Sequence, residues 1–210
     1  MSPPCIKIRT ILQYHNVQYK KIGGKKKDSE YKKIPVLLLN GIQINDSFIM
    51  VKNLAPILDG KALTEEEVKF EEEMSYGLMA ALDSQIMGDG SQISNLIGKA
   101  KNPALTCCLG VCCCNCLCCR GYMSRNVLKK NGLENNSTDK FIDMINERLD
   151  KSGFLQGDEI GILDLSLYGV TYMFAAKPVV ASFQAMLDKS PKFAQWWLKM
   201  NQTVGEIDIN

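Results

Sequence analysis

The hydrophobic pattern of this chain changes at about residue 60, and the change limits the folds open to it. Before that point, a stretch with helical period, Cys5–His15, is followed by short apolar runs typical of strands. After it, only the helical period remains. The sequence therefore predicts a small α/β domain over residues 1–60 and an all-helical domain over residues 61–210.

Local signals predict the elements of the first domain. Pro3 and Pro4 can open a helix, because proline at the first helical positions loses no hydrogen bond. Asn40-Gly41 is the turn signal of a two-residue hairpin, and Asp46-Ser47 has the residue types of a helix N-cap. The predicted elements are, in order, a helix over Cys5–His15, a strand over Val17–Ile22, a buried strand over Ile34–Leu39, a return strand over Ile42–Ile44 and a helix ending at Leu58.

The second domain is predicted to consist of helices separated by polar or glycine-containing breaks. Thr64-Glu-Glu-Glu67 has the pattern of a capping box, which predicts the start of a long acidic helix running towards Met87. Leu163–Ala176 is apolar almost all round, as is typical of a helix at the centre of a domain. Further helices are predicted over Asp139–Leu149 and Lys192–Thr203.

The composition argues against several classes of function. Hydrophobic residues make up 46% of the 210, enough to bury a core, and 25 Lys+Arg against 23 Asp+Glu leave a net charge of +2. So small a surplus argues against nucleic acid as a partner. The N-terminal residues lack the pattern of a secretory signal, and 9 cysteines without such a signal indicate a reducing compartment. We therefore expect a cytoplasmic protein.

Four short motifs occur in an order that one superfamily shares. Ser2-Pro3-Pro4-Cys5 stands at a helix start, where glutaredoxin-like folds carry Cys-Pro-x-Cys, and Ile34-Pro35 matches a pair whose proline is cis in those folds. Asp46-Ser47 matches an acidic-Ser pair that holds the γ-glutamyl end of glutathione. Gly161-x-x-Asp164 is similar to the capping box of a buried helix. Together the motifs resemble the glutathione S-transferase superfamily, which implies a thioredoxin-like N-terminal domain and a helical C-terminal domain.

Within that superfamily, the chain is most similar to the membrane-associated prostaglandin E synthase type 2 family. The likeness lies in residues 2–22, 30–50 and 154–170, in the same order and with similar spacing. It implies an enzyme of lipid metabolism that isomerises a prostaglandin endoperoxide to prostaglandin E, a hydroxy-ketone, and so takes a hydrophobic small molecule as substrate. Two alternatives stay open: a generic glutathione transferase or monothiol oxidoreductase, and a non-catalytic, membrane-associated adaptor with the same fold.

The resemblance assigns roles to five residues. Cys5 is the expected catalytic thiol, and its place at a helix N-terminus is expected to lower its pKa. A cis Pro35 would turn the backbone N–H and C=O of Ile34 towards a peptide-like ligand. Asp46 would meet the ammonium group of glutathione and Ser47 its carboxylate, although an ordinary N-cap is the alternative for this pair. Glutathione is thus the expected ligand, haem is left open as a second cofactor, and no metal ligands are assigned.

The chain departs from the superfamily pattern at its N-terminus. Ser2 stands where related sites carry a cysteine, so an intramolecular dithiol cycle cannot run there, and Pro4 replaces an aromatic residue. The first strand of the thioredoxin-like sheet has no counterpart. We therefore expect the natural chain to extend upstream of Met1 with a short β-rich segment. The resemblance also leaves open a homodimer and a peripheral attachment to membranes.

The cysteine-rich segment, residues 107–119, allows three interpretations. Its thiols can pack as small apolar side chains, serve as sites of S-acylation beside basic residues, or form a thiolate metal cluster. Four of them, at spacings of four, four and three, would form one stripe on a helix, which favours burial. The eight cysteines are Cys107, Cys108, Cys112, Cys113, Cys114, Cys116, Cys118 and Cys119.

Overall fold

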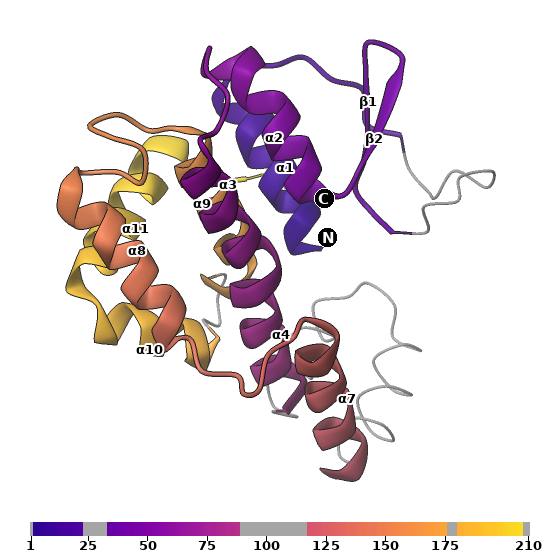
Figure 1. Ribbon diagram of the computed structural model, residues 1–210, viewed down its shortest axis with the longest axis vertical. Coiled ribbons are helices and arrows are strands. Elements are labelled where there is room, and N and C mark those ends of the chain that lie inside the picture. Colours follow the sequence, from indigo (N-terminus) through magenta and orange to yellow (C-terminus); the bar gives the residue numbers. More distant parts are fainter. Residues whose placement is uncertain (1, 23–32, 89–116, 176–179, 208–210) are drawn as a thin grey trace.

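The computed structural model describes residues 2–22, 33–88, 117–175 and 180–207. Figure 1 shows two neighbouring helices and a hairpin on one side of the molecule and a group of helices on the other. A rod of consecutive helical segments runs down the length of the molecule. The described part is mostly helical, with one two-stranded sheet.

The first part of the chain folds in the predicted order of helix, hairpin and helix. Its elements are α1 (Pro3–Tyr14), β1 (Val36–Leu39), β2 (Ile42–Asn45) and α2 (Ser47–Leu58). Asn40 and Gly41 have φ values of 50° and 84°, the left-handed conformations that a two-residue hairpin turn requires. The two strands pair antiparallel, with Leu39 opposite Ile42 and Val36 opposite Asn45.

Two expectations for this part are wrong. Val17–Ile22 is not a strand, because no described residue forms a ladder with it and a strand needs a neighbour to supply hydrogen bonds. Nor is β1 a buried strand, since Val36 is 40% exposed and Leu38 is 68% exposed. The hairpin therefore leaves apolar side chains in contact with water.

The second part begins with a continuous helical rod. It consists of α3 (Glu65–Glu72), the π-helical segment η1 (Glu73–Leu78) and α4 (Met79–Gly88). The predicted capping box is present: the Thr64 N–H donates to Glu67 Oε2 at 2.8 Å, and the Glu67 N–H donates to Thr64 Oγ1 at 3.2 Å. The sequence did not predict η1. In that segment Gly77 lies tightly against Phe141, so that a Cβ atom would come within 2.6 Å of Phe141 Cε1.

The remaining described helices complete the bundle. They are α7 (Leu117–Lys130), α8 (Asp139–Lys151), α9 (Ile162–Ala175), α10 (Ala181–Lys189) and α11 (Pro191–Val204). Of these, α8, α9 and α11 match predicted helices, whereas α10 was not predicted. Residues 107–116 of the cysteine-rich segment lie outside the described residues, and Cys118 and Cys119 are placed only as part of the α7 backbone. The three interpretations of that segment stay open.

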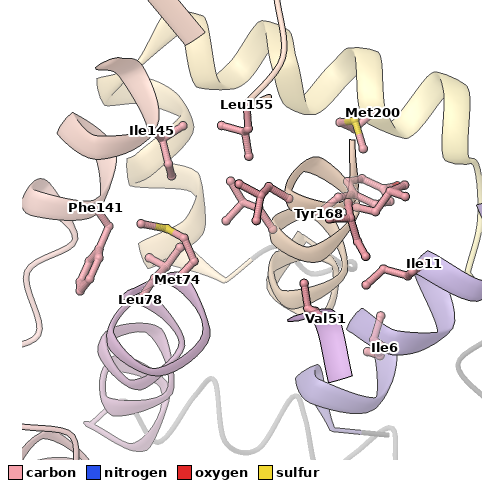
Figure 2. Packing of buried hydrophobic residues seen from close by; sticks show 14 of the residues in the cluster. Ile6, Ile11, Val51, Met74, Leu78, Phe141, Ile145, Leu155, Tyr168 and Met200 are labelled. Carbon is pink, nitrogen blue, oxygen red and sulfur yellow. The ribbon is translucent and has the colours of Figure 1, made fainter. Parts of the chain in front are cut away.

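The central helix is α9, as its apolar sequence predicts. Residues 162–171 are all buried. Figure 2 shows Tyr168 of this helix among buried side chains that come from the surrounding helices. Gly169 lets α1 come into backbone contact with α9, because a Cβ atom there would lie 2.5 Å from the Cα atom of Lys7. The first helix is therefore seated directly on the helical bundle.

A buried ion pair joins α1 to the rod. Lys7 and Glu71 are 0% and 1% exposed, and Lys7 Nζ lies 2.9 Å from Glu71 Oε1. Lys7 also donates to Ser75 Oγ at 2.7 Å. The hydroxyl groups of Ser75 and Ser166 donate to the Glu71 carboxylate at 2.7 and 2.8 Å. These four side chains form the Lys7–Glu71 cluster, in which each buried charge has a counter-charge and further hydrogen bonds, as a buried ion pair requires.

Asp164 fixes the start of α9. Its carboxylate accepts hydrogen bonds from the Leu155 N–H at 2.9 Å, the Gly161 N–H at 3.2 Å and the indole Nε1–H of Trp196 at 2.7 Å. This is the cap that Gly161-x-x-Asp164 predicts. Burial raises the pKa of Asp164 to about 6, although the three hydrogen bonds act in the opposite direction.

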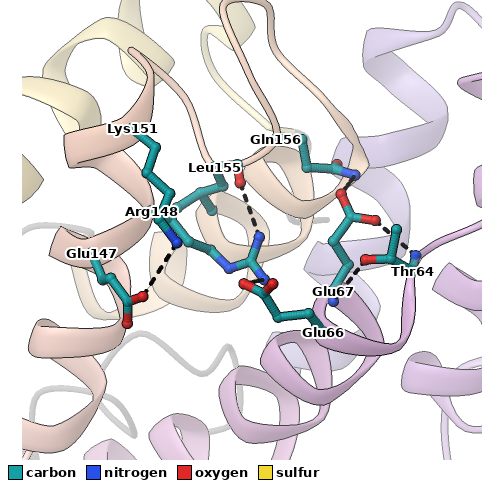
Figure 3. A network of polar contacts seen from close by, with 8 residues as sticks. All are labelled: Thr64, Glu66, Glu67, Glu147, Arg148, Lys151, Leu155 and Gln156. Carbon is teal, nitrogen blue, oxygen red and sulfur yellow. Dashed lines mark hydrogen bonds and ion pairs between the residues drawn. The ribbon is translucent and has the colours of Figure 1, made fainter.

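A polar network ties the loop before α9 to the first turn of α3 (Figure 3). Gln156 donates to Glu67 Oε1 at 2.9 Å. Arg148 donates to Glu66 Oε1 at 3.0 Å and to the Leu155 carbonyl oxygen at 3.3 Å. Glu67 also closes the capping box of α3. Its carboxylate therefore stabilises the start of the rod and holds the loop that precedes the central helix α9.

The Lys7–Glu71 cluster predicts strong coupling between its two charges. Lys7→Met leaves a buried carboxylate without a counter-charge and should lower the free energy of unfolding by about 3–5 kcal/mol. The double variant Lys7→Met/Glu71→Met should recover at least half of that loss, because both charges are removed together. Urea unfolding of the parent and both variants measures these changes. The control is Lys140→Met, which breaks the more exposed pair with Glu73 and should cost under about 1 kcal/mol. A double variant as unstable as the single one would contradict the coupling.

Asp83 predicts a pH dependence of stability. Burial within α4 raises its pKa from the usual 3.8 to about 6. The folded protein then holds a proton that the unfolded chain has lost, so this contribution to stability is complete below pH 3.8 and is lost as the pH rises through 6. A shift of this size corresponds to a loss of at most about 3 kcal/mol. Asp83→Asn should reduce the change in unfolding free energy across this range and leave the part that Asp164 contributes. Asp143→Asn, at an exposed site on α8, should leave the whole change as it is in the parent.

Candidate functional site

The residues that the sequence singles out lie at the starts of α1, β1 and α2. The helices α1 and α2 lie side by side and run in the same direction, so their N-termini are at the same end (Figure 1). Val36 at the start of β1 pairs with Asn45 at the end of β2, one residue before Asp46. The hairpin register therefore places Ile34-Pro35 beside Asp46-Ser47.

Cys5 is in the first turn of α1 and is partly exposed. Ser2 is the N-cap residue, and its carbonyl oxygen accepts hydrogen bonds from the N–H groups of Cys5 and Ile6 at 3.0 and 3.1 Å. The Ser2 hydroxyl donates to Cys5 Sγ at 3.2 Å. The thiol group therefore has a hydrogen-bond donor and the positive end of a helix dipole close to it.

Ile34 and Pro35 immediately precede β1. The peptide bond between them is cis, as the resemblance implies. Ile34 is 48% exposed and Pro35 is half-buried. The backbone of Ile34 thus lies at the accessible start of the strand.

Asp46 is the N-cap of α2, a role that leaves its predicted part in glutathione binding untested. Asp46 Oδ1 accepts a hydrogen bond from the Phe48 N–H at 2.9 Å, and within the described residues Oδ2 has no partner. The backbone of Asp46 has φ 69° and ψ 126°, a strained conformation for a residue other than glycine. Such strain concentrates at functional sites. Ser47 is 8% exposed and begins the helix.

Tyr76 is a residue near the site that the sequence analysis missed. Its ring packs on Phe48, the residue after Ser47, with 5.7 Å between the ring centroids. Lys52 Nζ lies 5.4 Å from the same Phe48 ring. Tyr76 belongs to η1, where the helical period changes, so a regular 3.6-residue pattern could not assign it to this face. The rod is therefore in contact with the start of α2.

The side chains described near Cys5 do not include a histidine that could ligate haem iron. His15, the single histidine of the chain, is at the opposite end of α1, where its Nε2 lies 3.4 Å from Asp59 Oδ1. Among the residues that the structure describes, no group of three His, Cys, Asp or Glu side chains could hold a metal ion. None of the described helices is long and apolar enough to span a bilayer.

Comparisons with known proteins support the fold. No protein-family model matches the chain, and no curated protein matches it significantly. The solved structures that match include two that are similar over almost the whole length of the chain. One is a glutathione S-transferase-I bound with lactoylglutathione, with 18% identity, coverage of 97% of this chain and 92% of the other, and a TM-score of 0.59. The second is a class Gtt2 glutathione S-transferase of Vibrio parahaemolyticus, with 15% identity, coverage of 98% and 93%, and a TM-score of 0.54. The chain therefore has the fold of the glutathione S-transferases.

Proposed function

We propose that this protein is a glutathione-dependent transferase in which Cys5 is the nucleophile. The observation that carries the proposal is the single thiol in the first turn of α1, with the Ser2 hydroxyl donating to its sulfur at 3.2 Å. A hydrogen-bond donor and a helix N-terminus beside the sulfur can stabilise the negative charge that the sulfur carries when it reacts. The similarity to a structure that contains lactoylglutathione supports glutathione as the co-substrate.

The start of α2 has the chemistry to hold the γ-glutamyl end of glutathione. Free N–H groups and the dipole at a helix N-terminus suit a carboxylate, which Ser47 would receive. Asp46 would meet the ammonium group with Oδ2, while Oδ1 keeps its capping bond to Phe48. The backbone of Ile34, next to this pair, would form strand-type hydrogen bonds with the cysteine part of the tripeptide.

The chemistry that fits one thiol is transfer through a mixed disulfide. The Cys5 thiolate attacks the glutathione sulfur of a glutathionylated substrate, forms a Cys5–glutathione disulfide and releases the substrate thiolate. The thiolate of a second glutathione then attacks the glutathione sulfur of that disulfide, which produces oxidised glutathione and restores the Cys5 thiolate. Ser2 cannot compete by forming an intramolecular disulfide, so glutathione is the reductant.

A second candidate is isomerisation of a prostaglandin endoperoxide to prostaglandin E. Residues 2–22, 30–50 and 154–170 favour it through their likeness to the type 2 synthases. This isomerisation has no net electron transfer, so it also needs only one thiol. That thiol would be Cys5, which would attack or polarise the peroxide. Turnover of the endoperoxide at a rate above that of glutathionylated substrates would favour this candidate. Binding of glutathione with neither transfer activity nor endoperoxide turnover would favour the third alternative, a non-catalytic adaptor with the same fold.

Asp46 provides the test of glutathione binding. Asp46→Asn should weaken binding about ten- to a hundredfold, because the ion pair with the ammonium group is lost. Asparagine also caps helices and tolerates positive φ, so the fold should be kept. Isothermal titration with glutathione measures the change. Thr64→Ala is the matched control: it removes the cap of α3 and should bind glutathione as the parent does. Equal binding by the parent and the Asp46 variant would remove the glutathione site from α2.

Cys5 and Ser2 provide the test of the chemistry. Cys5→Ser should bind glutathione normally and lose transfer activity, because only the nucleophile is changed. Ser2→Cys should gain a new property, since the Ser2 oxygen is 3.2 Å from Cys5 Sγ and a second thiol there is within reach of a disulfide. Mass spectrometry after mild oxidation should find an internal disulfide in this variant and a glutathione adduct in the parent. Full transfer activity in Cys5→Ser would exclude Cys5 as the nucleophile.

A further inference from the structure

An aromatic residue of the rod, Tyr76, is in contact with the start of α2. Tyr76 is half-buried in η1, and its ring packs on the ring of Phe48 with 5.7 Å between the centroids. Phe48 belongs to the first turn of α2, yet only 8% of it is exposed. The contact thus joins the helical part of the chain to the turn that carries Asp46 and Ser47.

The first turn of α2 has few backbone hydrogen bonds, because the leading N–H groups of a helix have no partner within it. The N–H group of Phe48 donates to Asp46 Oδ1 at 2.9 Å. The regular helical pattern begins with the N–H of Met50, which donates to the Asp46 carbonyl oxygen at 3.0 Å. The position of the Phe48 backbone therefore depends on the Asp46 carboxylate and on where the Phe48 ring is held.

Asp46 has a backbone conformation that needs support from both sides. Its φ of 69° is costly for a residue with a Cβ atom, and such strain persists only where the surroundings fix it. On the strand side, Asn45 is held by its pairing with Val36. On the helix side, the Asp46 carboxylate is bonded to Phe48, whose ring packs on Tyr76. Tyr76 therefore supplies part of the support on the helix side.

The residues on either side of Tyr76 fix its place in the rod. Ser75, which precedes it, is buried and belongs to the Lys7–Glu71 cluster. Gly77, which follows it, is buried tightly against Phe141 of α8. Segments of π-helix are rare and occur frequently at functional sites. The backbone of Tyr76 is thus held against α1 and α8 while its ring contacts α2.

Given the proposed function, on which this inference rests, we propose that Tyr76 is a positioning residue for glutathione. Its ring holds Phe48, and the Phe48 N–H holds Asp46 Oδ1. The fixed carboxylate then directs its Oδ2 towards the ammonium group of the γ-glutamyl end. Tyr76 acts through Phe48 and does not touch the ligand. The helical part of the chain thereby sets the affinity of a site whose ligand contacts come from residues 1–60.

Substitutions of Tyr76 separate the effect of the ring from that of the hydroxyl group. Tyr76→Leu removes the aromatic contact and should weaken glutathione binding about three- to tenfold, as expected for the loss of one aromatic pair. Tyr76→Phe keeps the ring and should restore the affinity of the parent. Tyr14→Leu is the matched control, because Tyr14 is also half-buried with a ring contact, to His15, but lies at the opposite end of α1. Isothermal titration with glutathione measures all four proteins.

A double-variant cycle with Phe48 tests the route of the effect. If Tyr76 acts through Phe48, adding Tyr76→Leu to Phe48→Leu should change the glutathione affinity by less than about twofold. A full additional loss in the double variant would mean that Tyr76 contacts the ligand directly, and it would overturn the positioning role. Thermal melting of each variant confirms that it is folded.

Amide hydrogen exchange tests the support of Asp46 without any ligand. Tyr76→Leu should speed the exchange of the Phe48 N–H about three- to tenfold, because the first turn of α2 then opens more often. Tyr76→Phe and Tyr14→Leu should leave this rate unchanged. Alkylation of Cys5 by iodoacetamide, followed by peptide mass spectrometry, should proceed at the parent rate in every variant, because the start of α1 is not altered.

The two measurements separate the positioning role from the proposed function. Faster Phe48 exchange together with weaker glutathione binding supports the positioning role. If glutathione binds to the parent and to Tyr76→Leu alike, the positioning role is wrong and the proposed function stands. Weaker binding with unchanged Phe48 exchange, or a Tyr76→Phe variant as weak as Tyr76→Leu, would also overturn it. If the parent does not bind glutathione, the proposed function fails and takes the ligand of this site with it, and the exchange rate of Phe48 still decides whether Tyr76 holds Asp46.

Discussion

The buried ion pair between Lys7 and Glu71 is the interaction on which the arrangement of the whole chain depends. It brings together α1, the rod and α9, and neither charge can be left in the interior alone without a cost of several kcal/mol. The apolar contacts around it tolerate small shifts, but a charged pair with fixed hydrogen bonds does not. The seating of α1 on the bundle is therefore specified by polar geometry as well as by the close approach at Gly169.

This seating also decides where the candidate nucleophile lies. Residues two positions apart on a helix point to nearly opposite sides, so Cys5 faces away from the bundle when Lys7 faces into it. The same turn of α1 thus has a structural side and a reactive side. Phe48 and Tyr76 form a second connection between the start of α2 and the rod. The proposed glutathione site is in this way held by contacts that come from outside residues 1–60.

The features that could be predicted from the sequence are those with local causes. The hairpin follows from Asn40-Gly41, the start of the rod from its capping box and the central helix from an unbroken apolar run, and the cis bond at Pro35 agrees with the resemblance. Val17–Ile22 was predicted wrongly because a strand depends on a partner that local pattern cannot supply. The strained backbone of Asp46 and the contact of Tyr76 depend on tertiary structure, and neither has a signature in residue type or spacing.

The π-helical segment has a consequence for how the rod can vary. A π turn contains one residue more than an α turn, so everything after it is rotated by about 100° around the helix axis relative to an uninterrupted α-helix. Upstream of η1 the rod presents Glu71 to α1, and downstream it presents Ser84 to Ser124 of α7, with 2.7 Å between the two hydroxyl oxygens. The π-helical segment η1 therefore determines the angle around the helix axis between the face with Glu71 and the face with Ser84. A rod from which one residue of η1 is deleted could keep either face in place, but not both.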